Sequence, residues 1–331
     1  MFDNQVIAIT GGTGSFGRAF IRKLLHSYSP KKVIVFSRDE LKQYEMEREF
    51  TASTMRFFIG DVRDRRRLVQ AFDKVDYVVH AAALKHIRAA EYNPSECIKT
   101  NIYGAENVIS AAIECGVKKV IALSTDKAAN PINLYGATKL ASDKLFVAGN
   151  NMVGQRETRL SVVRYGNVIG SRGSVVPFFR KIIKQGATEL PITDERMTRF
   201  WITPSEGADF VVKSFFRMHG GEIFIPRIPS ARIVDLAMAM SPNAKLRVVG
   251  IGPGEKLHEI LCPADDSTRT IQFTDHFVIC PSITFHAHPE YTENAIGERG
   301  SPVAAGFEYK SETNSHFLSV KELSELVASE L

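Results

Sequence analysis

The sequence contains few cysteines, and their spacing gives them no evident structural or metal-binding role. Only four occur among 331 residues, namely Cys97, Cys115, Cys262 and Cys280. No two of them form a C-x-x-C pair, and no cluster of cysteine and histidine has the spacing of a zinc site. We therefore expect no metal ion, and the scarcity of cysteine favours a protein that works in a reducing compartment.

The sequence also lacks the patterns typical of secreted, membrane and nucleic-acid-binding proteins. No run approaches 18 apolar residues, which argues against a membrane span. Met1 leads directly into a strand-like segment, so we expect no signal peptide. The net charge is +5, but the basic residues are scattered except in the run 63–67, which we interpret as the solvated start of a helix. We predict a cytoplasmic protein that binds neither membrane nor nucleic acid, and its mild positive charge suits an anionic small substrate.

What the sequence does contain is a regular alternation of short apolar runs and helical stretches. With 44% apolar residues, the chain can bury a large core in one domain or in two that share a core. Continuous apolar strands separated by helices indicate a parallel sheet buried on both faces. We therefore predict a Rossmann-type, doubly wound α/β fold. The predicted strands are 6–10, 32–37, 56–60, 75–80, 118–124 and 159–165, and the predicted helices are 15–26, 39–50, 64–72, 94–115 and 134–150.

A glycine motif follows the first predicted strand. The run VIAIT leads into Gly11, and glycines recur at Gly14 and Gly17 before a helix begins, which gives the spacing G-x-x-G-x-x-G. Glycine lets the backbone approach a pyrophosphate, and the helix N-terminus supplies N–H donors and a partial positive charge. Because the motif lies between the first strand and the first helix of an alternating pattern, it predicts a dinucleotide site and not a plain turn.

The ends of the next strands indicate which dinucleotide binds. Ser37 lies 20 residues after Gly17, where an acidic residue would bind the ribose 2′-hydroxyl of NAD. Ser37 and Arg38 instead suit a 2′-phosphate, so NADP is favoured, although Asp39 keeps NAD open. Asp61 and the adjacent Val62 end the third strand, where we expect the adenine.

The pattern changes after about residue 166. Gly, Pro and Arg become frequent, and only a strand at 222–226 and a helix at 233–240 are indicated. The last 45 residues are polar and weakly patterned, and they could wrap the surface or contact a partner subunit. We predict a dinucleotide-binding domain at 1–166 and a smaller, partly interleaved region at 167–331 that mainly binds substrate.

Tyr135 and Lys139 form a Y-x-x-x-K pair on a predicted helix. The i, i+4 spacing places both side chains on one face. A lysine ammonium near the phenol would lower the tyrosine pKa and make it a usable base for oxidising a hydroxyl. A hydroxyl pair, Ser124 and Thr125, ends the preceding strand about ten residues upstream. Together these features predict hydride-transfer chemistry.

Asp126 and Lys127 lie between that strand end and the tyrosine. A simple dehydrogenase or an epimerase needs no additional acid and base there. A dehydratase needs both, because it protonates a leaving hydroxyl and removes a proton next to a carbonyl. From the spacing alone, a solvent-exposed loop pair is an equally good interpretation.

Several segments resemble the inverting UDP-N-acetylglucosamine 4,6-dehydratases, which belong to the extended short-chain dehydrogenase/reductase family. The resemblance covers residues 2 to about 285. Some related capsule-pathway dehydratases have Met at the position of Tyr135. The segments are TGGTGSFG (10–17), FSRDELK (36–42), GDVRD (60–64), AAALKH (81–86), STDKAANPINLYGATK (124–139), VRYGNVIGSRGSVVP (163–177) and MTRFWIT (197–203).

The resemblance implies roles at matching positions. Asp126 would be the acid for the C6 hydroxyl, Lys127 the base at C5, and Tyr135 with Lys139 and Thr125 the redox group. Lys85, Asn167, Arg199 and Glu255 would hold substrate. A lysine base must be neutral, and we expect burial beside Lys139 and the nicotinamide to lower the Lys127 pKa. The cofactor-binding residues that we predict are Gly11, Thr13, Gly14, Ser15, Phe16, Gly17, Ser37, Arg38, Asp39, Lys42, Asp61, Val62, Ala81, Lys85, Thr100, Tyr135, Lys139 and Val168.

The chain departs from the family pattern at two positions. The family usually has R-P-G-E-K where this chain has Gly252 followed by PGEK, so an expected cation is missing. Arg88 stands where the family often has Pro, and it could replace that cation. Otherwise, substrate affinity would be lower.

The resemblance implies the first step of pseudaminic acid biosynthesis for flagellin or surface glycosylation, with UDP-N-acetylglucosamine as substrate and a tightly bound NADP that is regenerated in each turnover. It also implies a homo-oligomer, with a hexamer among the options. The alternatives are a UDP-sugar 4-epimerase, a C5-retaining dehydratase and a non-catalytic NADP-sensing protein. The pair Asp126 and Lys127 argues against the first, since an epimerase does not need it. Retaining dehydratases typically have Glu in place of Lys127, and sensors often lose Tyr or Lys from Y-x-x-x-K.

Overall fold

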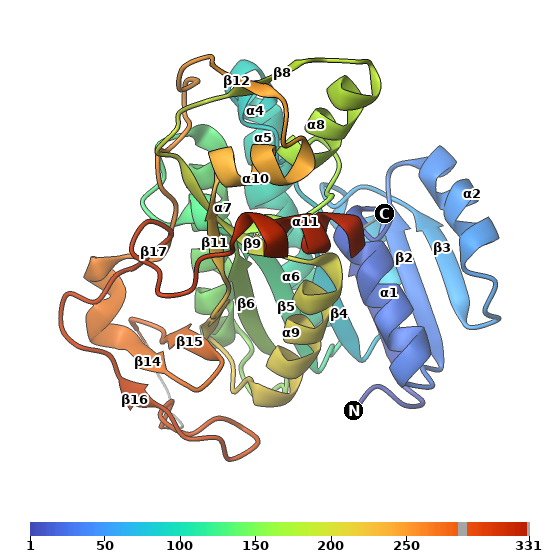
Figure 1. The fold of residues 1–331 in the computed structure, drawn as a ribbon. Coiled ribbons are helices and arrows are strands. Elements are labelled where there is room, and N and C mark those ends of the chain that lie inside the picture. The colour runs from blue at the N-terminus through green and yellow to red at the C-terminus, as the bar shows by residue number, and fades with distance from the viewer. Residues whose placement is uncertain (284–289, 330–331) are drawn as a thin grey trace.

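A ten-stranded sheet forms the centre of the molecule in the computed structural model, which describes residues 1–283 and 290–329 (Figure 1). The strand order is β16-β14-β15-β10-β6-β5-β4-β1-β2-β3. The seven strands from β10 to β3 are parallel, and β15, β14 and β16 add an antiparallel edge. Its strands are β1 Val6–Thr10, β2 Lys32–Ser37, β3 Met55–Ile59, β4 Tyr77–His80, β5 Lys119–Thr125, β6 Arg159–Tyr165, β10 Ile223–Pro226, β14 Thr270–Gln272, β15 His276–Ile279 and β16 Ser301–Pro302.

The order 3-2-1-4-5-6 within this sheet is that of the Rossmann fold and confirms the predicted fold class. All six predicted strands are present, with bounds that differ by at most two residues at each end. Helices cover both faces, and α1 and α9 pack side by side on one of them (Figure 1). The helices are α1 Ser15–Ser27, α2 Glu40–Glu49, α3 Arg65–Phe72, α4 Ile87–Tyr92, α5 Pro94–Ile98, α6 Gly104–Glu114, α7 Leu134–Gly149, α8 Val175–Lys184, α9 Pro204–Arg217, α10 Ile233–Met240 and α11 Val320–Ser329.

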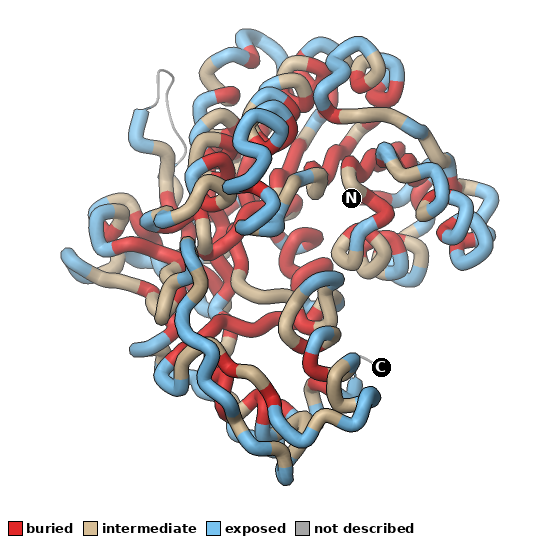
Figure 2. Tube along the Cα trace, turned by 90° about the horizontal axis from the view of Figure 1, so that it is seen from above, coloured by how far each residue is buried: buried red, intermediate tan, exposed pale blue. Residues whose placement is uncertain are grey.

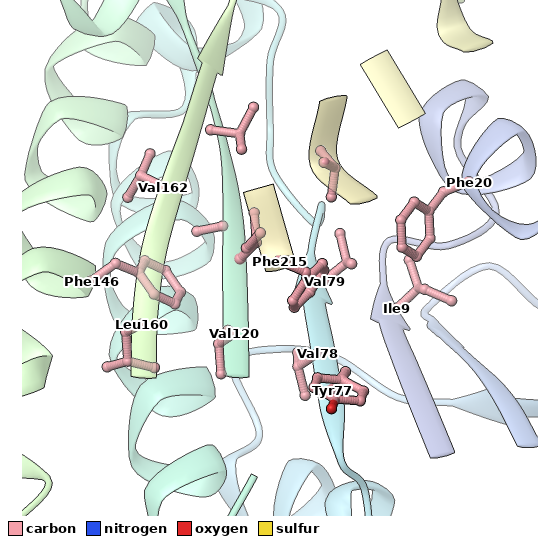
Figure 3. Packing of buried hydrophobic residues seen from close by; sticks show 14 of the residues in the cluster. Ile9, Phe20, Tyr77, Val78, Val79, Val120, Phe146, Leu160, Val162 and Phe215 are labelled. Atoms are coloured by element: carbon pink, nitrogen blue, oxygen red, sulfur yellow. The ribbon is translucent and has the colours of Figure 1, made fainter. Parts of the chain in front are cut away.

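The main core lies between the sheet and these helices. Figure 3 shows Phe20 of α1, Phe215 of α9 and Phe146 of α7 among the apolar side chains of the strands. The buried segments lie in the interior of the molecule, and the exposed segments lie on the periphery (Figure 2). The helix α9 begins with a capping box between Thr203 and Glu206 and has Pro204 in its first turn, which satisfies backbone N–H groups at its start.

A second, smaller core lies over the carboxyl ends of the parallel strands. It gathers side chains of α8, α10, α11 and three short strands, among them the buried Trp201. In the small sheets, β9 pairs with β11 and β7, β12 pairs with β8, and β13 pairs with β17. Their bounds are β7 Asn167–Val168, β8 Glu189–Ile192, β9 Thr198–Ile202, β11 Ser230–Arg232, β12 Lys245–Val248, β13 Ile260–Cys262 and β17 Tyr309–Lys310.

The chain after residue 166 contributes to both cores. The helix α9 and the strands β10, β14 and β15 belong to the main sheet and its core, whereas α8, α10 and α11 build the second core. The weakly patterned C-terminal segment adds β16 and β17 to two sheets, and α11 packs on α10 with Leu323 and Val327 buried. The described part of this segment therefore packs on the surface of the rest of the same chain.

The long helix predicted over 94–115 is interrupted in the structure. Between α5 and α6, residues Lys99–Tyr103 form a π-helical segment. There the Asn101 side chain accepts a hydrogen bond from the backbone N–H of Leu84 at 2.8 Å and donates one to its carbonyl at 2.9 Å. A π-helical turn often occurs at a functional site, and this one holds the loop that follows β4. Among the described residues, no helix is both long and apolar enough to cross a membrane.

Candidate active site

A cavity of about 870 Å³ opens at the carboxyl ends of the parallel strands, where open α/β sheets bind ligands. Its walls come from the glycine turn, the ends of β2, β4 and β5, the helix α7, and the loops after β6 and β7. Of the predicted site residues, Gly11, Thr13, Gly14, Ser15, Phe16, Gly17, Ser37, Arg38, Asp39, Lys42, Val62, Ala81, Lys85, Thr100, Thr125, Lys127, Tyr135, Lys139, Asn167, Val168 and Glu255 line it. Asp61, Asp126 and Arg199 are not among the lining residues, and the last two are buried. Among the described residues, no cluster of His, Cys, Asp and Glu is placed to hold a metal ion.

The glycine turn is closely packed against its own backbone. A Cβ atom on Gly17 would lie 2.2 Å from the carbonyl oxygen of Gly12. Gly11 has φ +66°, and a Cβ there would lie 2.7 Å from the backbone nitrogen of Ala82. Side chains are therefore excluded at both positions, and the N-terminus of α1 faces the cavity as an anion site requires.

The end of β2 presents a hydroxyl and a cation to the cavity. Ser37 Oγ lies 3.0 Å from Thr13 Oγ1. The side chain of Arg38 is 49% exposed, and its nearest carboxylate partner is Asp61 at 3.5 Å. Asp39 instead caps α2 by accepting the Lys42 N–H at 3.0 Å, and it also pairs with the Lys42 ammonium. The Lys42 hydrogen bonds hold the pKa of Asp39 below its usual value.

Tyr135 and Lys139 lie on α7, whose N-cap Asn133 accepts the Gly136 N–H at 2.7 Å. Lys139 is buried, and burial lowers its pKa against the opposing effect of Asp143. Asp143 in turn accepts hydrogen bonds from Ser124 at 2.8 Å and from Arg164 at 3.0 Å. The end of β5 and the helix α7 are thus joined through a buried carboxylate.

The expected lowering of the Tyr135 pKa is wrong for this structure. Burial raises the pKa of Tyr135 to about 12, and the positive charge of Lys127 and a hydrogen bond with Thr125 only partly offset it. The protein alone therefore holds a neutral phenol, and additional positive charge is needed to form the phenolate.

Asp126 and Lys127 are not an exposed loop pair. They form a 3₁₀ turn, Asp126–Ala128, directly after β5. Asp126 is fully buried, and its Oδ1 accepts hydrogen bonds from Thr125 Oγ1 at 2.8 Å and from Lys127 Nζ at 3.0 Å. Its Oδ2 has no hydrogen-bond partner in the part of the chain that the structure describes. Lys127 lines the cavity with Asp126 directly behind it.

The expected lowering of the Lys127 pKa is also wrong for this structure. Burial does lower it, but the nearby carboxylates of Asp126 and Glu259 outweigh burial and raise the pKa above the ordinary lysine value. The sequence interpretation considered only burial, Lys139 and the nicotinamide, and it missed the second carboxylate.

Glu259 is a residue that sequence reasoning missed. It precedes β13, is buried, and places Oε1 at 3.3 Å from Lys127 Nζ. No local pattern marks it, because its position depends on β13 lying beside the 3₁₀ turn from a distant part of the chain. The loop after β7, including Arg172, also lines the cavity and was not predicted individually.

The loop 252–256 lies beside the residues that follow β4. A Cβ on Gly254 would meet Ile87 at 3.1 Å, and both Arg88 and Glu255 line the cavity. Arg199, by contrast, donates to the carbonyls of Leu257 at 3.1 Å and Lys256 at 2.9 Å. It therefore holds this loop from behind.

The chain matches the family described as polysaccharide biosynthesis protein over residues 7–281. It is 60% identical over 328 residues to the inverting UDP-N-acetylglucosamine 4,6-dehydratase of Campylobacter jejuni subsp. jejuni serotype O:2, which covers 99% of this chain and 98% of that relative. It is 45% identical over 276 residues to a UDP-glucose 4-epimerase of Rickettsia akari, with 81% of each covered. The solved structure of Pen from Bacillus thuringiensis has a TM-score of 0.90 and 36% identity, covering 100% of this chain and 99% of that one.

These matches span both the glycine turn and the 3₁₀ turn Asp126–Ala128, so the resemblance inferred from the sequence segments is confirmed. The chain belongs to the polysaccharide biosynthesis protein family and, within it, to the inverting UDP-N-acetylglucosamine 4,6-dehydratases.

Proposed function

We propose that this chain is a hydro-lyase that removes water from UDP-N-acetylglucosamine and inverts C5, giving UDP-2-acetamido-2,6-dideoxy-β-L-arabino-hex-4-ulose. The observation that carries this proposal is the contact of Asp126 with Lys127 at 3.0 Å, where Lys127 lines the same cavity as Tyr135 and Lys139 and Asp126 lies directly behind it. An oxidation site and an acid–base pair in one cavity are the two requirements of a 4,6-dehydratase.

Tyr135 would take the proton of the C4 hydroxyl during oxidation. The bound nicotinamide supplies the hydride acceptor at C4 and the hydride donor at C6. Because the pKa of Tyr135 is raised to about 12 in the protein alone, a cationic ring close by would be needed to bring the phenolate within reach. Lys139, buried on the same face of α7, would hold the cofactor ribose and add positive charge.

Lys127 would accept the C5 proton, which the C4 ketone makes acidic, and Asp126 would protonate the C6 hydroxyl, which leaves as water. After hydride has returned to C6, a proton drawn from solvent would add to the opposite face of C5 and complete the inversion. In the ion pair, Lys127 carries the proton that Asp126 needs. Transfer of this one proton gives a neutral amine and a carboxylic acid without any exchange with solvent. The base and the acid are therefore formed together, and the 3.0 Å contact is short enough for the transfer.

We propose NADP as the cofactor. Arg38 is half exposed at the cavity with only a 3.5 Å carboxylate partner, so it can bind a 2′-phosphate. The carboxylate of Asp39 already serves as the α2 N-cap and pairs with Lys42, which leaves it poorly placed to bind a ribose hydroxyl. The proposed cofactor residues are the predicted ones that line the cavity, with Asp61 orienting Arg38.

The nucleotide-sugar would lie against the region 167–331, which we propose to be mainly substrate-binding. Lys85, Asn167 and Glu255 line the cavity near the acid–base pair, and Arg88 offers a cation on the same wall. The proximity of residues 87 and 254 supports Arg88 as the replacement for the cation missing at Gly252. Arg199 would act through the loop that it holds.

By its family membership, we propose that the enzyme works in the cytoplasm as a homo-oligomer, with a hexamer as the state to test, and that it opens pseudaminic acid biosynthesis for flagellin or surface glycans.

The test is incubation with UDP-N-acetylglucosamine in deuterated water, followed by mass spectrometry and NMR. We expect loss of one water, deuterium at C5 and the L-configuration. An isomer of unchanged mass would show a 4-epimerase, and a dehydrated product with retained C5 would show the retaining reaction. Binding of NADP without any turnover would support a sensor and contradict the proposal.

A further inference from the structure

Glu259 lies in an unusual position for a carboxylate. It is 2% exposed, and its backbone N–H donates to Ser311 Oγ at 2.9 Å. Its Oε1 lies 3.3 Å from Lys127 Nζ and 3.7 Å from Arg199 Nε, and its Oε2 has no hydrogen-bond partner among the described residues. A buried carboxylate costs free energy unless charged partners compensate it, and here Lys127 and Arg199 are those partners.

The Lys127 ammonium has three acceptors within reach, which equals its number of N–H donors. They are Asp126 Oδ1 at 3.0 Å, Asn167 Oδ1 at 3.4 Å and Glu259 Oε1 at 3.3 Å. Each acceptor belongs to a different segment: the turn after β5, the strand β7 and the approach to β13. A lysine side chain has many rotamers, and three acceptors that surround Nζ select one position for it.

We propose that Glu259 is a positioning residue for Lys127: it fixes the amine at the cavity wall and sets when that amine carries a proton. It does not line the cavity, so it acts through Lys127 and not on the substrate. The proposal rests on the proposed function only where it concerns catalysis.

The charges around Lys127 explain how Glu259 would act. Asp126 and Glu259 face it with negative charge, Arg199, Lys85 and Lys256 with positive charge, and Tyr135 and Asn167 are neutral. Removing the Glu259 charge leaves one carboxylate facing three cations. Since Glu259 raises the Lys127 pKa, its loss will lower that pKa and favour the neutral amine.

The first experiment reads the protonation of Lys127 without requiring turnover. Glu259→Gln and wild type are treated with limiting acetic anhydride at fixed pH, and acetylation of Lys127 is followed by peptide mass spectrometry. Lys127 lines the cavity and its side chain is 21% exposed, so the reagent can reach it. We expect Lys127 to be acetylated roughly tenfold faster in Glu259→Gln than in wild type, the ratio produced when the pKa of the amine falls by one unit.

Glu312→Gln is the matched control, because Glu312 pairs with His258 and Lys310 beside the same segment but does not contact Lys127. It should leave Lys127 acetylation unchanged. Equal acetylation in Glu259→Gln and wild type would overturn the proposal.

The second experiment follows catalysis in Glu259→Gln and in Glu259→Asp, which keeps the charge but shortens the reach. Both should slow deuterium entry at C5 by roughly tenfold or more, with KM and the formation of reduced cofactor unchanged. The alkaline limb of the pH profile should move to lower pH in Glu259→Gln only. Equal loss of oxidation and elimination, with a lower melting temperature, would indicate a merely structural residue and refute the role. If wild type removes no water, the proposed function fails, and the acetylation result still decides the role of Glu259.

Discussion

The two ends of the cavity are built in different ways. The proposed cofactor end consists largely of backbone: glycines 11, 14 and 17 remove side chains, and a helix N-terminus supplies the donors. The proposed catalytic end consists of charged side chains withdrawn from water, with Asp126 fully buried and Lys127 21% exposed. A backbone site depends on the order of a few neighbouring residues, whereas a site of buried charges depends on every segment that surrounds them.

This contrast predicts where a single change will have its largest effect. Buried charges act strongly on one another, so losing one of them should remove a chemical step. At the cofactor end the interactions are spread over many backbone groups, so losing one side chain should only weaken binding.

The largest effect is expected for Lys127→Ala. Without the base, elimination should fall by about 10⁴ or more, at or beyond the upper end for general acid–base catalysis. Nucleotide binding should remain nearly intact, as titration calorimetry would measure. Lys144→Ala, an exposed lysine on α7, is the control. Normal water loss in Lys127→Ala would show that Lys127 is not the base and that the buried charges do not perform the elimination.

Asp126→Asn should come next. Oxidation at C4 should survive while elimination slows by about 10²–10⁴, the contribution of a general acid. Reduced cofactor should accumulate with little dehydrated product in a single turnover, which absorbance and mass spectrometry would detect together. Equal slowing of both steps would instead mean that the Asn distorts the turn.

Arg38→Ala tests the cofactor end. Losing one charge-assisted contact should weaken NADP by about 1.5–3 kcal/mol, roughly ten- to a hundredfold, and leave NAD unaffected. Arg48→Ala is the matched control, since Arg48 lies on α2, the helix that follows Arg38, but stacks on Tyr44 and does not line the cavity. If NAD and NADP weaken equally in titrations, the assignment of Arg38 to a 2′-phosphate is wrong.

The smallest effect is expected for glycine changes in the apo protein. The Cβ of Gly17→Ala would clash with the Gly12 carbonyl at 2.2 Å and should cost about 1–3 kcal/mol of stability. The Cβ of Gly14→Ala would lie 3.3 Å from the Gly11 oxygen and should be tolerated. Thermal melting without nucleotide would measure the difference, and equal melting temperatures would show that the turn is less closely packed than the structure indicates.

Features that depend on neighbouring residues were predicted correctly from the sequence, and features that depend on contacts between distant segments were missed. The parallel strands, the glycine turn and the i, i+4 pair of Tyr135 and Lys139 were predicted correctly as structural elements, since each is a local pattern. The π-helical segment at 99–103 was missed, because it forms where the Asn101 side chain hydrogen-bonds to Leu84, which lies in the loop after β4.

The sequence by itself determined the parallel part of the sheet, the glycine turn and the identity of the chemical groups, but not the antiparallel edge of β14, β15 and β16. Apolar runs between helices leave few other ways to bury them, and glycine spacing encodes a backbone path. Only the tertiary structure decided the protonation of those groups. The pKa of Lys127 is raised instead of lowered because two carboxylates together outweigh burial: Asp126, its neighbour in the sequence, and Glu259, which β13 brings to 3.3 Å from it across 132 residues of chain. Coulomb energy depends on distance in space and on exclusion of water, and neither is written in the local order of residues.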